Sequence, residues 1–242
     1  MGRTEVRGAI LIPALMLGAC SMGEAGESKG GRESRDFAVG AFDRISLTGS
    51  SNVLVTVGGA PSVRAEGDSR LIEKLEIKVE NGVLRIGYKK GNWSFGRRKD
   101  HGPVTIHVST AALRGAEVAG SGDMKIDKVE GGDFAGEIAG SGEIQLASLR
   151  ARKASFAIAG SGGVTASGTA ETAHFDIAGS GDVRAGGLQV RSAKVSIAGS
   201  GNVETRATES ADVDIMGSGD VVVTGGAKCS VNKMGSGDVR CG

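Results

Sequence analysis

The sequence is poor in aromatic residues, proline and net charge. Aromatic residues make up 3% of its 242 residues, proline occurs three times, and the formal net charge is +1. A core with so few rings must be thin and built mainly from Val, Ile, Leu and Ala. Because proline is scarce and the 42 glycines follow no Gly-X-Y triplet, collagen is excluded. A neutral chain gives no reason to expect nucleic acid as a partner.

The sequence also lacks the residue clusters that catalysis and metal binding need. Its three histidines, His101, His107 and His174, are widely separated and show no metal-ligand spacing. None of them falls near a cysteine in the register of the repeats described below. We therefore predict no catalytic residue, no metal site and no cofactor, and a protein that is not an enzyme.

Residues 1–19 are predicted to form a signal peptide of the lipoprotein type. Arg3 and Arg7 precede a mostly apolar run, Ala9 to Ala19, which is interrupted by a proline and too short for a permanent transmembrane helix. The run ends in Leu17-Gly18-Ala19-Cys20, which resembles the bacterial lipobox, whose cysteine is lipidated and becomes the mature N-terminus. The alternative is an ordinary cleaved signal peptide, in which this cysteine is incidental.

Lipidation of Cys20 predicts a protein of the cell envelope. Ser21, rather than Asp, after the cysteine is typical of sorting to the outer membrane, where the body would face either the periplasm or the exterior. Residues 20–35 are small, polar and rich in Gly and Ser, so they are predicted to form a flexible tether. The predicted membrane contact is this N-terminal lipid anchor.

A Gly-Ser-Gly tripeptide occurs seven times in residues 114–242. Its spacings are 20, 20, 19, 20, 18 and 18 residues, and a fixed period near 20 is typical of stacked repeats. The tripeptides are Gly120-Ser121-Gly122, Gly140-Ser141-Gly142, Gly160-Ser161-Gly162, Gly179-Ser180-Gly181, Gly199-Ser200-Gly201, Gly217-Ser218-Gly219 and Gly235-Ser236-Gly237. Apolar and polar positions alternate on both sides of each tripeptide, which indicates a strand with one buried face on either side.

Each repeat therefore contains two short strands joined by a Gly-Ser-Gly corner, and it cannot bury its apolar face alone. Stacking of equivalent residues about 4.8 Å apart would turn each apolar column into a ladder inside the core. We predict an all-β fold, a parallel β-helix or β-solenoid of about seven such coils. The alternative is that each repeat folds as an antiparallel hairpin in a barrel or sandwich.

The position after each corner is mainly acidic, which raises a calcium-binding alternative. It holds Asp123, Glu143, Gly163, Asp182, Asn202, Asp220 and Asp238. Calcium-binding β-helices that combine Gly with Asp have a period of about nine residues and several oxygen ligands per turn. Here each coil offers at most one carboxylate, so we expect these side chains to accept hydrogen bonds from corner N–H groups and to stay solvated.

Residues 36–113 are predicted to form a β-rich N-terminal part of the body. Leu75–Val79 alternates, Asn81-Gly82 is typical of a type I′ turn, and Val83–Ile86 returns, which is the strongest hairpin signal in the chain. A helical turn is expected within Asp68–Lys74, and Thr48–Asn52 is similar to a degenerate repeat corner.

One stretch of this part, Tyr88 to His101, is not explained by the repeat. Its candidate contact residues are the aromatic and basic side chains Tyr88, Trp93, Phe95, Arg97, Arg98 and Lys99. Aromatic rings among basic residues suit anionic lipid headgroups, a polysaccharide or another acidic partner. The alternative, common for loops of this kind, is a solvated hairpin tip whose rings cover the end of the core.

Cys229 and Cys241 fall in inward columns of the last coil, on opposite strands. In an oxidising compartment they are predicted to form a disulfide that stabilises the fold by about 3 kcal/mol, the alternative being two free buried thiols. Lys233 enters an otherwise apolar column of the same coil, as expected where stacking must stop.

The repeated columns, the hairpin at Asn81–Ile86 and the Asp-Val or Glu-Ile pattern after the corners resemble a bacterial family of unknown function. That family is described as "putative auto-transporter adhesin, head GIN domain", and the resemblance covers about residues 37–242. It implies a right-handed β-helical body in an exported protein. The basic loop around Trp93 and the terminal cysteine pair depart from the family pattern.

Two functions of different classes fit these observations. The first is a non-catalytic envelope lipoprotein that serves as an adhesin-like interaction module, with an envelope glycan or protein as its partner. The second is a carbohydrate-active enzyme, which would need paired carboxylates on one face, such as the stacked Glu117 and Glu137. Because the coils lack the long loops that wall a substrate groove, we predict the first function.

Overall fold

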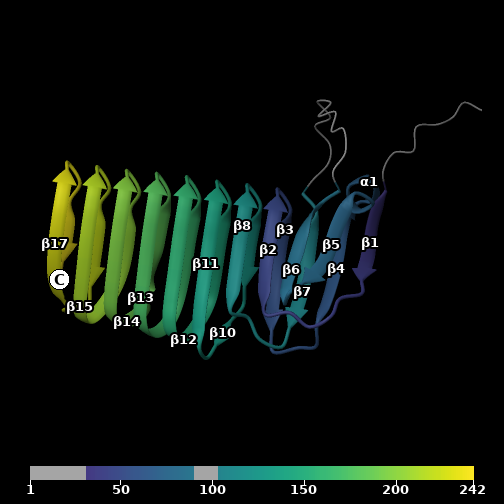
Figure 1. Ribbon diagram of the computed structural model, residues 1–242, viewed down its shortest axis with the longest axis horizontal. Coiled ribbons are helices and arrows are strands. Elements are labelled where there is room, and N and C mark those ends of the chain that lie inside the picture. Colours follow the sequence, from purple (N-terminus) through teal and green to yellow (C-terminus); the bar gives the residue numbers. More distant parts are fainter. Residues whose placement is uncertain (1–30, 90–102) are drawn as a thin grey trace, which may run out of the picture.

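A computed structural model describes residues 31–89 and 103–242, which form one elongated β-solenoid (Figure 1). The predicted signal peptide, Cys20 and most of the predicted tether lie outside these residues. The strands are β1 (Arg32–Phe37), β2 (Arg44–Gly49), β3 (Asn52–Val57), β4 (Ser62–Asp68), β5 (Leu75–Glu80), β6 (Val83–Tyr88), β7 (Thr105–Thr110), β8 (Gly115–Gly120), β9 (Asp123–Ile126), β10 (Val129–Glu130), β11 (Asp133–Gly140), β12 (Glu143–Gly160), β13 (Gly163–Gly179), β14 (Asp182–Gly199), β15 (Val203–Gly217), β16 (Val221–Thr224), β17 (Lys228–Gly235) and β18 (Val239–Cys241). The described residues contain one short helix, α1 (Ser69–Ile72), and none that is long and apolar enough to cross a membrane.

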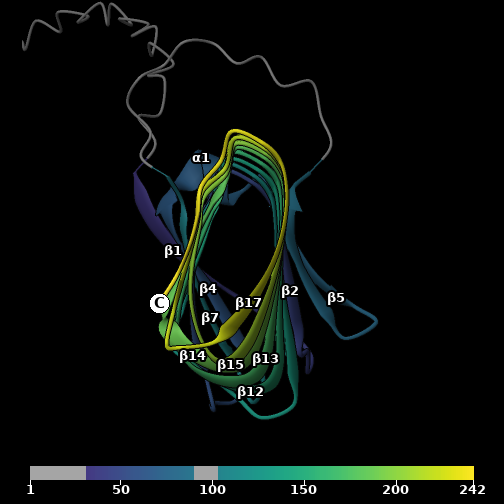
Figure 2. The ribbon, with the colours of Figure 1, turned by 90° about the vertical axis from the view of Figure 1, so that its left-hand side faces the viewer.

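The Gly-Ser-Gly corners stack on one another, as their period predicts. On one broad face, β8, β11, β12, β13, β14, β15 and β17 pair in parallel, and the first glycine of each corner aligns with its counterpart in the next coil. Six full turns separate the seven corners, so the predicted all-β solenoid of about seven coils is confirmed. Seen along its axis, the coil is a flattened loop with a narrow corner edge and a rounded opposite edge (Figure 2).

The corner glycines allow successive coils to approach closely. The first glycine of every corner has a φ between +129° and +140°, a conformation that residues with a Cβ rarely adopt. The serine N–H of one corner donates to the carbonyl oxygen of the first glycine in the preceding corner, as Ser141 does to Gly120 at 2.9 Å. The glycines therefore serve the geometry of stacking.

The largest side chains of the core are three phenylalanines in adjacent coils. Phe134, Phe156 and Phe175 are at most 2% exposed, and successive ring centroids are 6.0 and 5.8 Å apart. Phe156 and Phe175 stand in one column, whereas Phe134 stands two positions earlier in its coil. Gly136 occupies the shared column there, and a Cβ on it would lie 2.9 Å from the Phe156 ring. Ring and glycine thus exchange volume within one coil.

The N-terminal part adds layers to the solenoid. β2 and β3 pair in parallel with β8 and β9, and Gly49 aligns with Gly120, so Gly49-Ser50-Ser51 is a corner, as predicted. β6 and β7 pair in parallel with β2 and β3 and form a further layer. The predicted hairpin is β5–β6, with Asn81 and Gly82 at positive φ. The predicted helical turn is α1, capped by Asp68.

Antiparallel strands cover the N-terminal end, and one of them corrects the predicted tether. β5 pairs with β6, β4 with β7, and β1 with β4. Because β1 starts at Arg32, the folded body begins four residues before the predicted boundary at Asp36. The strand was missed because it is almost entirely polar. Backbone pairing holds it, together with ion pairs such as Arg64–Asp36 at 2.8 Å, rather than an apolar face.

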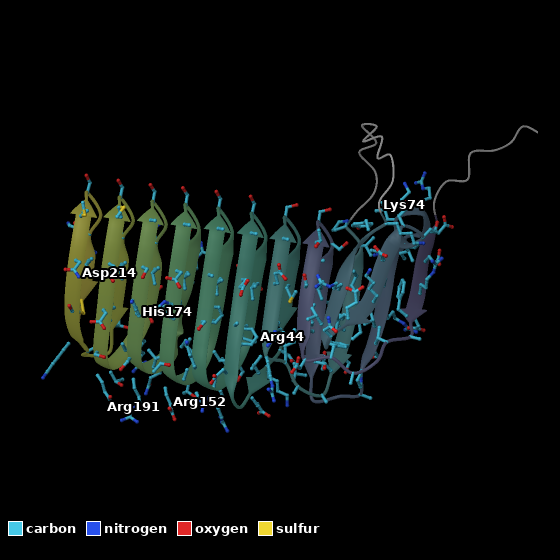
Figure 3. All side chains as sticks on the ribbon, in the orientation of Figure 1. Arg44, Lys74, Arg152, His174, Arg191 and Asp214 are labelled. Atoms are coloured by element: carbon cyan, nitrogen blue, oxygen red, sulfur yellow. A yellow bond between two sulfur atoms is a disulfide. The ribbon has the colours of Figure 1, made fainter. Side chains whose placement is uncertain are left out.

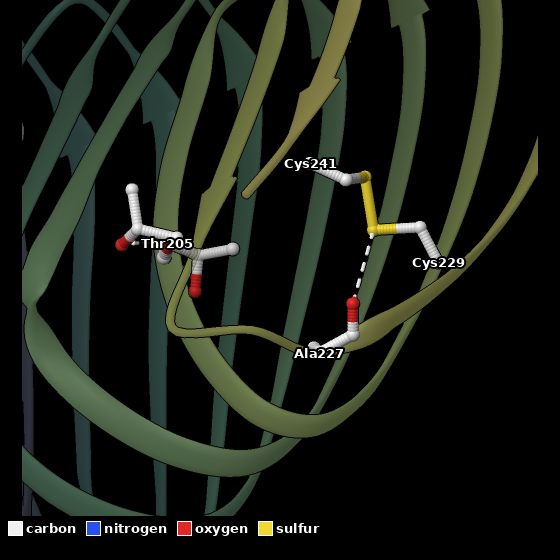
Figure 4. Close-up of a disulfide and its surroundings, with 5 residues drawn as sticks. Thr205, Ala227, Cys229 and Cys241 are labelled. Atoms are coloured by element: carbon white, nitrogen blue, oxygen red, sulfur yellow. Dashed lines mark hydrogen bonds between the residues drawn. A yellow bond between two sulfur atoms is a disulfide. The ribbon is translucent and has the colours of Figure 1, made fainter.

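The predicted disulfide closes the C-terminal coil. Cys229 and Cys241 are bonded across it, joining β17 to β18 (Figure 4). Lys233 Nζ donates to the carbonyl oxygen of Gly237 at 2.6 Å, so the lysine that interrupts an apolar column satisfies a corner carbonyl at this end. In the coil before, Thr205 Oγ1 is the single buried side-chain oxygen or nitrogen of the described residues without a hydrogen-bond partner.

Candidate functional site

Tyr88 is the one predicted contact residue that the structure describes. The others, which are Trp93, Phe95, Arg97, Arg98 and Lys99, lie outside the described residues. The hydroxyl of Tyr88 shares a hydrogen bond with Ser51 Oγ at 2.8 Å, and its ring lies against Gly49. Tyr88 therefore supports the neighbouring corner, which is a structural role.

The strands that flank the basic aromatic segment show where it is inserted. Ile86 of β6 pairs with Leu47, and Thr105 of β7 pairs with Asn52. These pairings bring both strands to the corner edge, where other coils turn within a tripeptide. The segment is thus a long insertion at the corner position of the layer that β6 and β7 form.

The position after each corner forms a ladder of hydrogen bonds between coils. Asp182 Oδ1 accepts the N–H of Asn202 at 3.2 Å, and Asp220 Oδ1 accepts the N–H of Asp238 at 2.8 Å. This confirms that such side chains accept hydrogen bonds from corner N–H groups. Within residues 31–89 and 103–242, no group of three or more His, Cys, Asp or Glu side chains is placed to hold a metal ion.

A shallow groove of about 660 Å³ runs along the broad face beside the corner edge. One wall is the outward position immediately before each corner, and the other is the outward position two residues earlier on the same strand. The first wall consists of Ala139, Ala159, Ala178, Ala198, Met216 and Met234. The second consists of Glu117, Glu137, Ala157, Asp176, Ser196, Asp214 and Asn232. We call this feature the alanine–methionine groove.

The two walls differ in chemistry. Met216 and Met234 are 64% and 71% exposed, which is unusual for large apolar side chains. On the other wall, Glu117 and Glu137 align in adjacent coils and make no ion pair with any described residue. His174 and Asp214 mark this face in Figure 3, whereas Arg152 and Arg191 lie at the opposite, rounded edge.

The groove does not assemble a catalytic set from the described residues. The nearest approach is His174, whose Nε2 lies 3.1 Å from Asp176 Oδ2 and which aligns with Ser155 of the preceding coil. No hydrogen bond joins Ser155 to His174 among these residues. The strands around them pair in parallel on both sides, so their N–H groups are committed to the ladder and form no oxyanion site.

The shifted pKa values belong to exposed ion pairs at the N-terminal end. A hydrogen bond from Arg64 lowers the pKa of Asp36, and a hydrogen bond from Lys78 lowers the pKa of Glu80. These pairs lie on β1, β4 and β5, at the far end from the exposed methionines. Exposed ion pairs of this kind contribute little to stability and mark no functional site.

The groove was missed in the sequence. Its signal stands immediately before each corner, where five repeats have Ala and the last two have Met. Alternation predicts a polar residue at an outward position, so a column of small apolar side chains was detectable there. Alanine is nearly neutral in hydropathy, which made the column easy to pass over.

Comparisons with solved structures support the fold. A "putative lipid binding protein" from Parabacteroides distasonis is 27% identical, with a TM-score of 0.71 over 88% of this chain and 98% of its own. A "putative adhesin" from Bacteroides fragilis is 24% identical, with a TM-score of 0.76 over 87% of this chain and 97% of its own. A further "putative adhesin", from Parabacteroides merdae, is 18% identical, with a TM-score of 0.67 over 88% and 97% of the two chains. The last two likenesses concern the fold alone.

No curated protein matches the chain. The model of a protein family matches residues 41–227, which include the N-terminal layers and all but the last of the Gly-Ser-Gly corners. The match covers well over half of the chain. The chain therefore belongs to the family described as "putative auto-transporter adhesin, head GIN domain".

Proposed function

We propose that this protein is a non-catalytic lipoprotein of the cell envelope that acts as an adhesin-like interaction module. The observation that carries the proposal is the outer surface, which repeats from coil to coil with no converging titratable groups among the described residues. A rigid solenoid presents such a surface to an extended partner rather than enclosing a small substrate. Membership of a family described as adhesins supports the same function.

The N-terminal lipid anchor completes the proposal. Cys20 and Arg32, where β1 begins, are separated by 11 residues of Gly-rich sequence. As a random coil such a tether spans about 20 Å, enough to hold the body off a membrane surface. It joins the solenoid at its N-terminal end, so the C-terminal coils with the exposed methionines are the part of the body farthest along the chain from the anchor.

Cys20→Ala is expected to release the protein from membranes. Without the thiol no lipid can be attached, and the described body offers no apolar helix in its place. Membrane and soluble fractions of expressing cells are compared by immunoblot, and mass spectrometry of the N-terminal peptide detects the lipid. Ser21→Ala, which leaves the cysteine intact, is the control and should stay with membranes. A wild-type protein in the soluble fraction with unmodified Cys20 would disprove the anchor.

The interaction function predicts binding to envelope material without turnover. The Cys20→Ala chain is immobilised and exposed to isolated envelopes and to a glycan array, and released sugars are measured in parallel. Retention of a glycan or protein with no released product is expected. Turnover that Glu137→Gln abolishes, and that the matched Glu171→Gln at the rounded edge leaves intact, would instead establish a carbohydrate-active enzyme.

A further inference from the structure

The end of the alanine–methionine groove is an exposed apolar surface that the solenoid itself does not use. Met216 and Met234 are adjacent on one wall, at the position where the five preceding coils have Ala. Their exposed fractions of 64% and 71% leave most of each side chain open to solvent. Methionine is flexible and polarisable, and proteins use it on surfaces that bind apolar segments. This end of the groove is therefore ready to receive an apolar side chain.

The surroundings of the groove carry charge of one sign. The outward positions that flank the corner edge on its two sides hold the carboxylates Glu117, Glu137, Asp176, Asp214, Asp123, Glu143, Asp182, Asp220 and Asp238. No Lys or Arg occupies any of these positions. A row of like charges with no compensating cation favours a positively charged ligand and repels anionic lipid headgroups.

Several of these carboxylates are available to a ligand. Glu117 and Glu137 are exposed, and their strands stack about 4.8 Å apart, so their like charges repel each other until a cation lies between them. Asp214 Oδ1 accepts a hydrogen bond from Asn232 Nδ2 at 3.1 Å, and Asp176 contacts His174. Each of these two aspartates keeps a second oxygen that accepts further donors.

The dimensions of the groove select an extended chain. Its walls are residues i and i+2 of the same strands, which lie about 7 Å apart, whereas an α-helix with its side chains is 10–12 Å wide. Along the axis the groove follows seven coils, a length of about 29 Å. An extended peptide of about nine residues spans that length.

We propose that the alanine–methionine groove binds an extended peptide segment of a partner protein in which Lys or Arg alternates with apolar residues. The basic side chains pair with the acidic wall, and the apolar ones rest on the alanines and the two methionines. The inference rests on the proposed interaction function and assigns the partner class. It also places the contact surface on the repeat itself, apart from the basic aromatic insertion.

Three synthetic nonapeptides test the groove by fluorescence anisotropy against the Cys20→Ala chain. They alternate Lys with Leu, Lys with Ser, and Glu with Leu. The Lys-Leu peptide is expected to bind at least roughly tenfold more tightly than either of the others, since it alone satisfies both walls. Its affinity should fall as salt is raised, because the charged wall is exposed to solvent.

Two double variants locate the binding surface. Glu117→Gln with Glu137→Gln is expected to weaken Lys-Leu binding about five- to tenfold, and Met216→Ser with Met234→Ser about tenfold. The matched controls are Glu130→Gln with Glu171→Gln, which makes the same charge change near the rounded edge, and Val222→Ser, which removes an exposed apolar side chain from the other broad face. Both controls should bind as the wild type does. Unchanged circular dichroism and melting temperature confirm that each variant is folded.

Three results would overturn the proposal. One is equal binding of the Glu-Leu peptide, and another is an equal loss of affinity in the control variants. The third is displacement of the Lys-Leu peptide by phosphatidylcholine vesicles, which would show that the groove takes a lipid. If the groove fails these tests while the immobilised chain still retains envelope material, the peptide inference falls and the interaction function stands.

Discussion

Gly179→Ala is expected to lower the free energy of unfolding by about 3–4 kcal/mol. Gly179 has a φ of +131°, and a Cβ there would collide with the carbonyl oxygen of Gly160 in the preceding corner. That oxygen accepts the N–H of Ser180 at 2.8 Å, so relieving the collision would break a hydrogen bond between coils. The strain of the backbone and the separation of the coils add together. Guanidinium unfolding followed by circular dichroism measures the loss.

Gly163→Ala is the matched control for this prediction. Gly163 directly follows a corner, is not at positive φ, and a Cβ there would meet its nearest neighbours at 3.7 and 3.8 Å, which is ordinary contact. Alanine should be neutral there or stabilise by up to about 1 kcal/mol, because it restricts the unfolded chain. Similar stability of the two variants would contradict the view that corner glycines are required by stacking.

Phe156→Ala is expected to cost about 3–5 kcal/mol. The ring is 1% exposed and lies between those of Phe134 and Phe175, at centroid distances of 6.0 and 5.8 Å. Its neighbour in the same column is Gly136, which has no side chain to move into the space. The cavity would therefore stay open, and both ring contacts would be lost. Urea unfolding and hydrogen exchange of the flanking strands measure the global and local effects.

Phe156→Leu is the graded comparison for this site. Leucine keeps most of the buried volume, so the expected loss is about 1–1.5 kcal/mol. A double substitution of Phe156→Ala with Gly136→Ala should recover part of the loss, since the new methyl would enter the vacated space. If Phe156→Ala cost no more than the leucine variant, the ring ladder would not be a principal part of the core.

Much of the coil was predictable because its signals are local and repeated. The Gly-Ser-Gly period locates every corner of residues 114–242, and alternation about each corner separates inward from outward positions. The same register places Cys229 opposite Cys241, which the structure confirms as a disulfide. The hairpin around Asn81-Gly82 was equally accessible, since a type I′ turn needs two residues that tolerate positive φ.

The candidate site was less accessible from the sequence. The basic aromatic segment drew attention because its composition differs from the repeat, and of its candidate residues the structure describes Tyr88, which packs against a corner. The alanine–methionine groove has no unusual composition in any one repeat. It exists only when two outward columns from all seven coils are brought side by side, and no short window of sequence contains both.

By itself, the sequence determined the coil, its corners and its closing disulfide. A period near 20 residues with alternating apolar positions leaves the stacked solenoid as the arrangement that buries every column. Only the tertiary structure decided that β2, β3, β6 and β7 extend the stack, that polar β1 joins β4, and that two outer columns form one groove. The physical reason is that alternation specifies which face of a strand is buried, whereas the identity of its neighbours depends on pairing between distant segments.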